Sequence, residues 1–176
     1  RSGMGRSSSF TVGLLNALHA LQGHMATKEQ LANESIMIEQ DILKENVGSQ
    51  DQVNAAYGGF NHISFHTSGE ISVRPVIIPP DRQDELTSHL MLFYTGIKRT
   101  ADKVAGQYVE SLETKRRQLR ILRDMVEESL SILCGSGPIK EFGELLHEGW
   151  LAKQAISDEI SNSAITELYN AARLSG

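Results

Sequence analysis

The sequence is short of the residues that mark several classes of protein. Its 176 residues include one cysteine, one tryptophan and four prolines, and aromatic residues make up only 6%. The single cysteine, Cys134, excludes an internal disulfide and favours a reducing, cytoplasmic setting. No apolar run reaches roughly 18 residues, so we expect no membrane-spanning helix. The first residues lack an apolar core and a small-residue cleavage site, so we expect no signal peptide.

The overall composition is that of a globular protein with a modest acidic excess. Hydrophobic residues make up 40% of the chain, charged residues 22%, and the formal net charge is -5. The first two values are ordinary for a soluble protein, and the length allows one domain or two small ones. The negative charge disfavours nonspecific binding to nucleic acid or to an anionic membrane. It does not disfavour a local phosphate site, which needs only a few hydrogen-bond donors.

Patterning along the chain predicts an α+β fold. Apolar residues at helical spacing, with capping pairs such as Thr27 with Gln30 and Ser49 with Gln52, predict helices. Alternation on either side of a Thr-Ser-Gly turn predicts a hairpin. The expected helices cover residues 10–21, 28–45, 50–56, 101–133, 139–156 and 164–174, and the expected strands cover residues 60–65, 71–78 and, as a buried strand, 89–94. Pro79-Pro80-Asp81 predicts a domain boundary near residues 80–87.

A basic stretch on the long expected helix allows two interpretations. It comprises Lys115, Arg116, Arg117, Arg120 and Arg123. Such a run can contact nucleic acid, but glutamates flank it and no aromatic residues interleave with it. The pattern therefore favours a solvated helix face, and we expect no nucleic-acid partner.

The first residues combine glycines and hydroxyls directly before a predicted helix. They read Gly3-Met4-Gly5-Arg6-Ser7-Ser8-Ser9. Glycines let backbone amides approach phosphate oxygens, and the helix adds its positive N-terminal end. A serine at such a place can also bind a Mg2+ ion held by the phosphates. The segment lacks the lysine of a Walker loop and the spacing of a dinucleotide fingerprint. Taken alone, it is equally well explained as a flexible loop with a capping serine.

Two carboxylates shift that balance towards phosphate chemistry. Glu39 lies on the second predicted helix, and Asp51 opens the short helix after Gly48-Ser49-Gln50. Each alone is more often a surface acid. A Mg2+ site, however, uses one or two carboxylates with phosphate oxygens and water, and a phosphoryl acceptor needs a carboxylate near its hydroxyl. The first turn of a helix favours a negative charge, so we expect Asp51 to act as a carboxylate. Positioning of the acceptor then suffices, because the transition state of phosphoryl transfer is loose.

These motifs together resemble the GHMP superfamily of galactokinase, homoserine kinase, mevalonate kinase and phosphomevalonate kinase. The glycine-serine segment resembles its phosphate loop, and Glu39 followed by Asp51 resembles its magnesium glutamate and catalytic aspartate. Further segments look most like those of the D-glycero-D-manno-heptose 7-phosphate kinases: Ile38-Glu39-Gln40-Asp41, Gln50-Asp51-Gln52, Ala56-Tyr57-Gly58-Gly59-Phe60-Asn61, Phe93-Tyr94-Thr95-Gly96 with Arg99, and Leu145-Leu146-His147-Glu148 with Trp150 and Lys153.

The resemblance implies roles for individual residues. Ser7 and Glu39 would bind Mg2+, and Asp51 would face the acceptor hydroxyl. Backbone amides would hold the ATP phosphates along Gly3, Met4, Gly5, Arg6, Ser7, Ser8 and Ser9. Arg6 replaces the usual serine or threonine, so it could contact a phosphate or obstruct the loop. For Arg99, His147 and Lys153, contact with the sugar or its phosphate and a purely structural role are both open.

The resemblance also implies a fold and a reaction. Residues 1–85 would be part of an N-terminal domain of the ribosomal-protein-like type, and residues 86–176 part of a ferredoxin-like C-terminal domain. The implied activity is ATP- and Mg2+-dependent phosphorylation of a small sugar phosphate, at the anomeric hydroxyl of D-glycero-D-manno-heptose 7-phosphate. A fucose-type sugar-1-kinase and a non-catalytic binding module are the alternatives.

Two motifs of the superfamily have no counterpart in the sequence. These are an N-terminal strand motif and a C-terminal glycine-rich loop. We therefore expect a fragment that is inactive, or nearly so, by itself.

Overall fold

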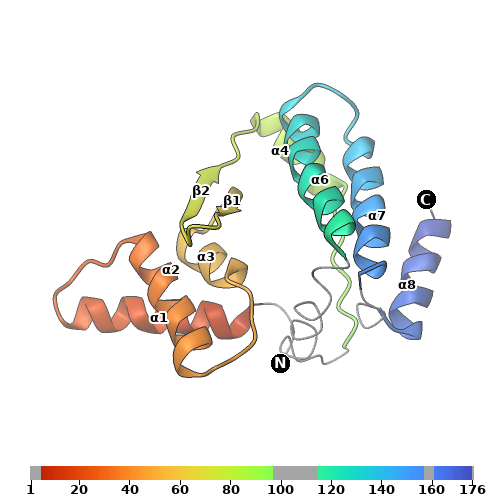
Figure 1. Cartoon of the computed structure of the whole chain (residues 1–176). Helices are drawn as coiled ribbons and strands as arrows, with labels where there is room; N and C mark the ends of the chain where they lie inside the picture. The colour runs from red at the N-terminus through yellow and green to blue at the C-terminus, as the bar shows by residue number, and fades with distance from the viewer. Residues whose placement is uncertain (1–4, 97–114, 157–160, 176) are drawn as a thin grey trace. The chain divides into compact units, whose positions relative to one another are not determined.

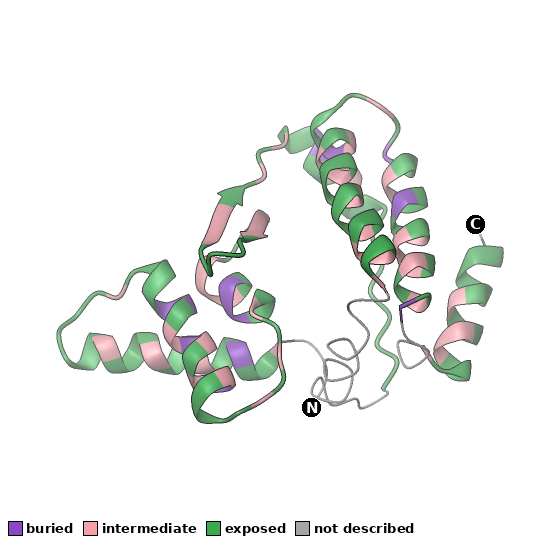
Figure 2. Cartoon of the chain, in the orientation of Figure 1, coloured by how far each residue is buried: buried purple, intermediate pink, exposed green. Residues whose placement is uncertain are grey.

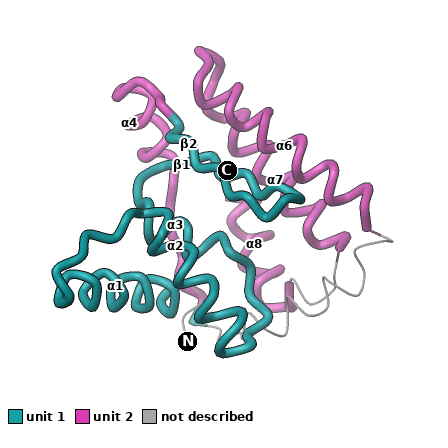
Figure 3. The backbone as a smooth tube through the Cα atoms, turned by 60° about the vertical axis from the view of Figure 1, so that its left-hand side comes forward, with its two compact units in different colours: residues 1–76, 96–105 teal, residues 77–95, 106–176 magenta. Residues whose placement is uncertain are grey.

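The computed structural model describes residues 5–96, 115–156 and 161–175. The chain divides into two compact units (Figure 3): unit 1 comprises Arg1–Val76 and Gly96–Ala105, and unit 2 comprises Ile77–Thr95 and Gly106–Gly176. Helices predominate in both units, and a single two-stranded sheet is found in the described part of the chain. The predicted α+β class is confirmed in this general form, whereas a domain boundary at residue 85 stays a prediction.

Unit 1 consists of packed helices and a hairpin (Figure 1). Its elements are α1 (Arg6–Leu21), α2 (Lys28–Met37), the π-helical η1 (Ile38–Ile42), α3 (Gln50–Tyr57), β1 (Asn61–Phe65) and β2 (Ile71–Pro75). Helices α1, α2 and α3 pack against one another in all three pairings. The strands pair antiparallel, with Ile63 opposite Val73. The apolar core of the unit is formed by Val12, Leu31, Ala32 and Val53 (Figure 2).

Hydrogen bonds at the helix ends test the two predicted caps. The Thr27 side chain accepts a hydrogen bond of 3.1 Å from the backbone N–H of Gln30, which confirms the first cap. The second is wrong, because Ser49 makes no side-chain cap to α3. Its hydroxyl instead accepts a hydrogen bond of 3.1 Å from Nε2 of Gln40, which also donates to the Val47 carbonyl at 2.9 Å. Gln40 thereby holds the loop that leads into α3.

Unit 2 contains helices in its described part. These are α4 (Pro80–Ser88), α6 (Arg116–Cys134), α7 (Lys140–Gln154) and α8 (Ser163–Leu174). Helices α6 and α7 pack along each other, and the apolar core consists of Leu133, Ile139, Leu145 and Ile156. Arg82 is buried and donates to the Ile132 carbonyl at 2.8 Å, which ties α4 to the end of α6. Helix α4 was not predicted, because its prolines suggested a break, yet Pro80 occupies the first turn, where a helix tolerates proline.

The expected buried strand at residues 89–94 is wrong. Residues 89–94 form no regular element, and the side chains of Leu90 to Tyr94 are 54–87% exposed. An apolar run becomes a buried strand only where another strand pairs with it, and the described residues of unit 2 contain no strand. Of the long helix expected at 101–133, residues 97–114 lie outside the described residues. No described helix is long and apolar enough to cross a membrane.

A polar contact joins α1 to α2 beside the apolar core. Nε2 of His19 lies 2.7 Å from Oε2 of Glu34, and Nε2 of Gln30 donates to Oε1 of the same carboxylate at 2.7 Å. The hydrogen bond from His19, and after it the one from Gln30, holds the pKa of Glu34 below its ordinary value of 4.5. The folded state therefore favours the ionised carboxylate more than the unfolded chain does.

Replacing Glu34 should change how stability depends on pH. Because the pKa of Glu34 is lowered in the folded state, its contribution is complete above pH 4.5 and is lost as the pH falls through the folded-state pKa. Urea unfolding of the protein and of Glu34→Gln should thus differ most near neutral pH, and the two should converge in acid. Glu29→Gln, an exposed substitution on the same helix, is the control and should not show this convergence. A pH-independent difference for Glu34→Gln would contradict the assignment.

Candidate functional site

The start of α1 presents free backbone donors. Gly5 precedes the helix with φ 61° and ψ 23°, a left-handed conformation that glycine adopts without strain. Its carbonyl accepts the first helical hydrogen bond, from the N–H of Ser9, at 2.9 Å. Among the described residues, no side chain caps this end, and the first turn contains no acidic residue. The first N–H groups of the helix therefore keep their capacity to bind an anion, and the helix dipole favours one.

Glu39 is a buried carboxylate beside this helix start. It lies on η1 and is only 3% exposed. Its Oε2 accepts hydrogen bonds from the Ser8 hydroxyl at 3.3 Å and from Nε2 of Gln52 at 2.6 Å. Its Oε1 is buried and has no hydrogen-bond partner among the described residues. A buried carboxylate oxygen without a donor is costly, so this atom is available to a cation or another donor.

Asp51 lies next to Gly5, the glycine that precedes α1. It occupies the first turn of α3 and is exposed. Its Oδ2 lies 3.5 Å from the position that a Cβ atom on Gly5 would take. The Asp51 carboxylate therefore lies close to the backbone at the start of α1, at a distance that would put it in van der Waals contact with a side chain at position 5. Glu39 contacts the first turn of α1 through Ser8 and Asp51 lies near Gly5, so carboxylates from two elements lie beside the start of α1.

The structure distinguishes between the neighbouring serines of the predicted phosphate loop. Ser8 is buried and contacts Glu39, whereas Ser7 is exposed and its carbonyl accepts a 3.0 Å hydrogen bond from the Thr11 hydroxyl. Successive side chains on a helix point about 100° apart, so only one of the two hydroxyls reaches the buried carboxylate. Arg6 and Ser9 are exposed, and Gly3 and Met4 lie outside the described residues. The role predicted for Ser7 stays a prediction.

The contact from Gln52 to Glu39 was not predicted. Gln52 was assigned as the partner of a capping Ser49, a cap that does not form, and as part of the stretch Gln50-Asp51-Gln52 that resembles the heptose 7-phosphate kinases. It is instead 1% exposed and directed into the interior of unit 1. The sequence contained one signal for this. Gln52 directly follows Asp51 on a short helix, and adjacent helical residues face different sides, so an exposed Asp51 allows Gln52 to face inward.

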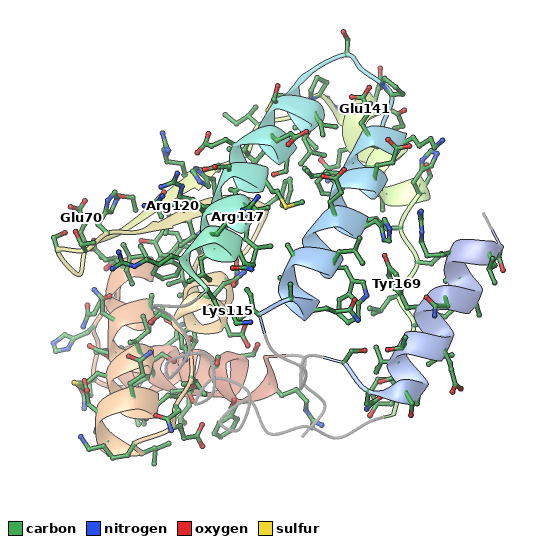
Figure 4. The ribbon with its side chains drawn as sticks, turned by 45° about the vertical axis from the view of Figure 1, so that its right-hand side comes forward. Glu70, Lys115, Arg117, Arg120, Glu141 and Tyr169 are labelled. Carbon is green, nitrogen blue, oxygen red and sulfur yellow. The ribbon has the colours of Figure 1, made fainter. Side chains whose placement is uncertain are left out.

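In unit 2, one of the three residues for which a sugar contact or a structural role was open, His147, has a structural partner. Nδ1 of His147 lies 2.6 Å from the hydroxyl of Tyr169, and the two rings stack with centroids 5.9 Å apart. Tyr169, labelled on α8 in Figure 4, also contacts Trp150 with ring centroids 5.4 Å apart. These contacts join α7 to α8. Lys153 is exposed on α7, and Arg99 lies outside the described residues.

The basic stretch on α6 lies at the start of that helix. Lys115 donates a hydrogen bond of 2.9 Å to the Ala155 carbonyl at the end of α7. Arg117 and Arg120 are exposed (Figure 4), and Arg123 pairs with its neighbour Asp124 at 2.8 Å. This arrangement is that of a solvated helix face, while the absence of a nucleic-acid partner stays a prediction.

The described residues contain no ready-made metal centre. No group of three or more His, Cys, Asp or Glu side chains that could hold a metal ion occurs in residues 5–96, 115–156 and 161–175. Mg2+ does not require such a group when it is bound with a nucleotide, because phosphate oxygens and water supply most of its ligands. A single protein carboxylate with a free oxygen is compatible with that mode.

Comparison with known proteins identifies relatives over most of the chain. Residues 1–59 match the family model of the GHMP kinases N terminal domain. A D-glycero-alpha-D-manno-heptose 7-phosphate kinase of Campylobacter jejuni is 25% identical over 173 residues, which are 97% of this chain and 51% of that protein. A bifunctional fucokinase/GDP-fucose pyrophosphorylase of Arabidopsis thaliana is 23% identical and is matched by 96% of this chain, over 16% of its own length.

A solved structure supports the same relationship. The crystal structure of a D-glycero-D-manno-heptose 1-phosphate kinase from Bacteroides thetaiotaomicron superposes with a TM-score of 0.63 at 27% identity. The match covers 87% of this chain and 44% of that one. The chain thus spans about half the length of the Campylobacter relative and less than half of the solved structure.

Alanine substitutions at Gly5 and Gly13 should have opposite effects on stability. Ala at residue 5 would have to adopt φ 61°, at a cost of about 1–2 kcal/mol. Gly13 lies inside α1 with no atom near its Cβ position, so Ala there should stabilise the protein by about 0.5–1 kcal/mol. Urea unfolding measures both changes. Equal effects at the two positions would contradict the conformation assigned to Gly5.

Proposed function

Because residues 1–59 match the family model of the GHMP kinases N terminal domain, we propose that the protein carrying this chain transfers the γ-phosphoryl group of ATP to a hydroxyl of a small sugar phosphate. One observation supports this most directly: the buried carboxylate of Glu39 and the exposed carboxylate of Asp51 meet at the free N-terminus of α1. A surface loop with a capping serine would not need two carboxylates around it.

The segment from Gly3 to Ser9 holds the ATP phosphates in this proposal. The uncapped amides at the start of α1 bind phosphate oxygens, and the helix dipole adds to their attraction. Gly5 keeps this approach free of side chains. Arg6 is exposed at the same turn and adds a guanidinium contact to a phosphate.

Glu39 and Ser7 bind the Mg2+ ion in this proposal. The donor set fits, because Oε1 of Glu39 is buried and unpaired and Mg2+ prefers oxygen ligands. When bound, Mg2+ neutralises charge that develops on the phosphates during transfer. Ser8 reaches Glu39 directly, so its hydroxyl holds the carboxylate in place.

Asp51 orients the acceptor hydroxyl and takes its proton. The acceptor oxygen forms a bond to the γ-phosphorus while the bond from that phosphorus to the bridging oxygen of ADP breaks, and ADP leaves. The hydroxyl proton passes to the Asp51 carboxylate. Asp51 is exposed and lies beside Gly5, so its carboxylate can contact a substrate bound next to the phosphate loop. A weak base suffices, because the proton leaves late in a loose transition state.

The proposed acceptor is the anomeric hydroxyl of D-glycero-D-manno-heptose 7-phosphate. Its support is the match to a heptose 7-phosphate kinase over 97% of the chain. A fucose-type sugar-1-kinase is the second candidate, because two fucokinase-containing enzymes match 96% of the chain each. Turnover of each acceptor by the whole protein decides between them. A non-catalytic binding module is disfavoured, because a module that carries out no chemistry has no need of all three residues, Ser7, Glu39 and Asp51.

Replacing Asp51 should abolish most of the turnover while nucleotide binding persists. Asp51→Asn keeps the shape of the side chain but cannot accept the proton, so we expect kcat to fall roughly 100- to 10,000-fold. The KM for ATP should stay close to that of the parent protein. Asp41→Asn, an exposed acid on η1, is the matched control and should leave kcat unchanged. Unchanged turnover in Asp51→Asn would show that Asp51 has no part in the reaction.

Alanine substitutions should distinguish the role of Ser7 in Mg2+ binding from the role of Ser8 in stability. Ser7 is exposed, so Ser7→Ala should raise the Mg2+ concentration needed for half-maximal turnover and change stability by less than about 0.5 kcal/mol. Ser8→Ala removes a hydrogen bond to a buried carboxylate and should destabilise the protein by about 1–3 kcal/mol. Mg2+ titrations and urea unfolding measure the two effects. The reverse pattern would transfer the metal-binding role to Ser8.

A further inference from the structure

We infer that Gln52 is a positioning residue, which holds the Glu39 carboxylate so that one oxygen stays directed to a Mg2+-nucleotide. The inference rests on the proposed function and assigns a role to a residue outside the predicted site. It starts from a contact of two buried polar side chains. Gln52 is 1% exposed and Glu39 is 3% exposed.

The hydrogen bond from Gln52 is the stronger of the two that Glu39 accepts. Nε2 of Gln52 lies 2.6 Å from Oε2, whereas the Ser8 hydroxyl lies 3.3 Å from the same oxygen. Hydrogen bonds to an ionised acceptor shorten and strengthen, and low dielectric surroundings strengthen them further. The orientation of Glu39 therefore depends mainly on Gln52.

The geometry of this contact leaves one carboxylate oxygen free. Both donors contact Oε2, while Oε1 is buried and has no partner among the described residues. The orientation of the Gln52 amide follows from the same chemistry, because a carboxylate only accepts and the opposite orientation would place two acceptor oxygens together. Gln52 thus occupies one oxygen of Glu39 and leaves the other for a cation.

Without the Gln52 amide, Glu39 would lose its principal donor in a site that water barely reaches. A buried carboxylate in that situation turns towards other donors. Such a turn moves Oε1 away from a bound cation and reduces the affinity for it. Residues that orient a metal ligand typically account for about 10- to 100-fold in metal affinity or activity.

Helix α3 also connects this contact to Asp51. Asp51 and Gln52 are adjacent in its first turn, and they face opposite surroundings. Asp51 is exposed beside Gly5, whereas Gln52 is directed inward to Glu39. The bond from Gln52 therefore fixes α3, and with it the Asp51 carboxylate, relative to η1.

Gln40 provides a matched control for a purely structural glutamine. It is adjacent to Glu39 in sequence and partly buried, and it also donates from Nε2. Its acceptors, however, are the Val47 carbonyl and the Ser49 hydroxyl of the loop before α3. Loss of this amide weakens the loop without removing a donor from Glu39.

The test is calorimetric binding of adenylyl imidodiphosphate, a non-hydrolysable ATP analogue, by the whole protein with and without Mg2+. In the parent protein, Mg2+ should tighten binding. In Gln52→Met, which keeps the volume but has no amide, the tightening by Mg2+ should fall by about 10- to 100-fold. The affinity measured without Mg2+ should change by less than about twofold. An equal loss of affinity with and without Mg2+ would instead indicate that the substitution damages the whole nucleotide site. Gln40→Met should retain the effect of Mg2+.

Glu39→Gln distinguishes failure of this inference from failure of the proposed function. If Mg2+ does not tighten binding in the parent, or if Glu39→Gln leaves the tightening intact, the metal role of Glu39 is wrong and the inference falls with it. If Glu39→Gln removes the tightening and Gln52→Met does not, only the role of Gln52 is wrong. In the double variant that combines Glu39→Gln with Gln52→Met, the tightening of nucleotide binding by Mg2+ should be no smaller than in Glu39→Gln alone.

A second variant keeps the test decisive if Gln52→Met does not fold. Gln52→Asn retains an amide, but its side chain is one methylene shorter and does not reach Oε2 of Glu39 to form the 2.6 Å hydrogen bond. This variant should show the same selective loss of the Mg2+ effect. Loss of the helical circular dichroism signal in both variants would overturn the inference in favour of a purely structural role.

Discussion

Unit 1 is organised around the removal of one carboxylate, that of Glu39, from water. A buried carboxylate is tolerated only where donors meet it, and these donors come from two other elements. Ser8 comes from α1 and Gln52 from α3, while Glu39 itself lies on η1. The apolar core brings the three helices together, and the polar contacts at Glu39 determine which turns of them meet.

Unit 1 also contains buried polar atoms that lack a hydrogen-bond partner in the part of the chain that the structure describes. Oε1 of Glu39, the hydroxyl of Ser35 and Oε1 of Gln52 are buried and have no hydrogen-bond partner among the described residues. Each such atom costs about 1–3 kcal/mol when it stays unpaired. Two further atoms of this kind, Nε of Arg82 and Oε1 of Gln118, lie in unit 2. Of the three in unit 1, Oε1 of Glu39 belongs to the carboxylate that contacts the first turn of α1 through Ser8. A bound ion would complete the coordination of this oxygen that the fold leaves open.

The local elements of the chain were largely accessible from sequence, because they depend on short-range chemistry. The cap from Thr27 to Gln30 formed as predicted, and so did the hairpin, α3, α7 and α8. The predictions were wrong where a side chain bonds to a residue outside its own helix, or where a segment has no strand to pair with. Ser49 bonded to Gln40 in place of capping α3, and the apolar residues 90–94 stayed exposed because no described strand of unit 2 pairs with them.

For the site, the sequence by itself determined the chemical parts: glycines before a helix, and two carboxylates of the kind that phosphoryl transfer uses. The spacing of Glu39 and Asp51 carried the resemblance, because residue types and their order are visible in a sequence. Only the tertiary structure decided which of the adjacent serines faces Glu39, that Gln52 anchors it, and that Asp51 lies against Gly5. The physical reason is rotation about the helix axis: neighbouring residues point in different directions, and packing alone decides which direction is inward.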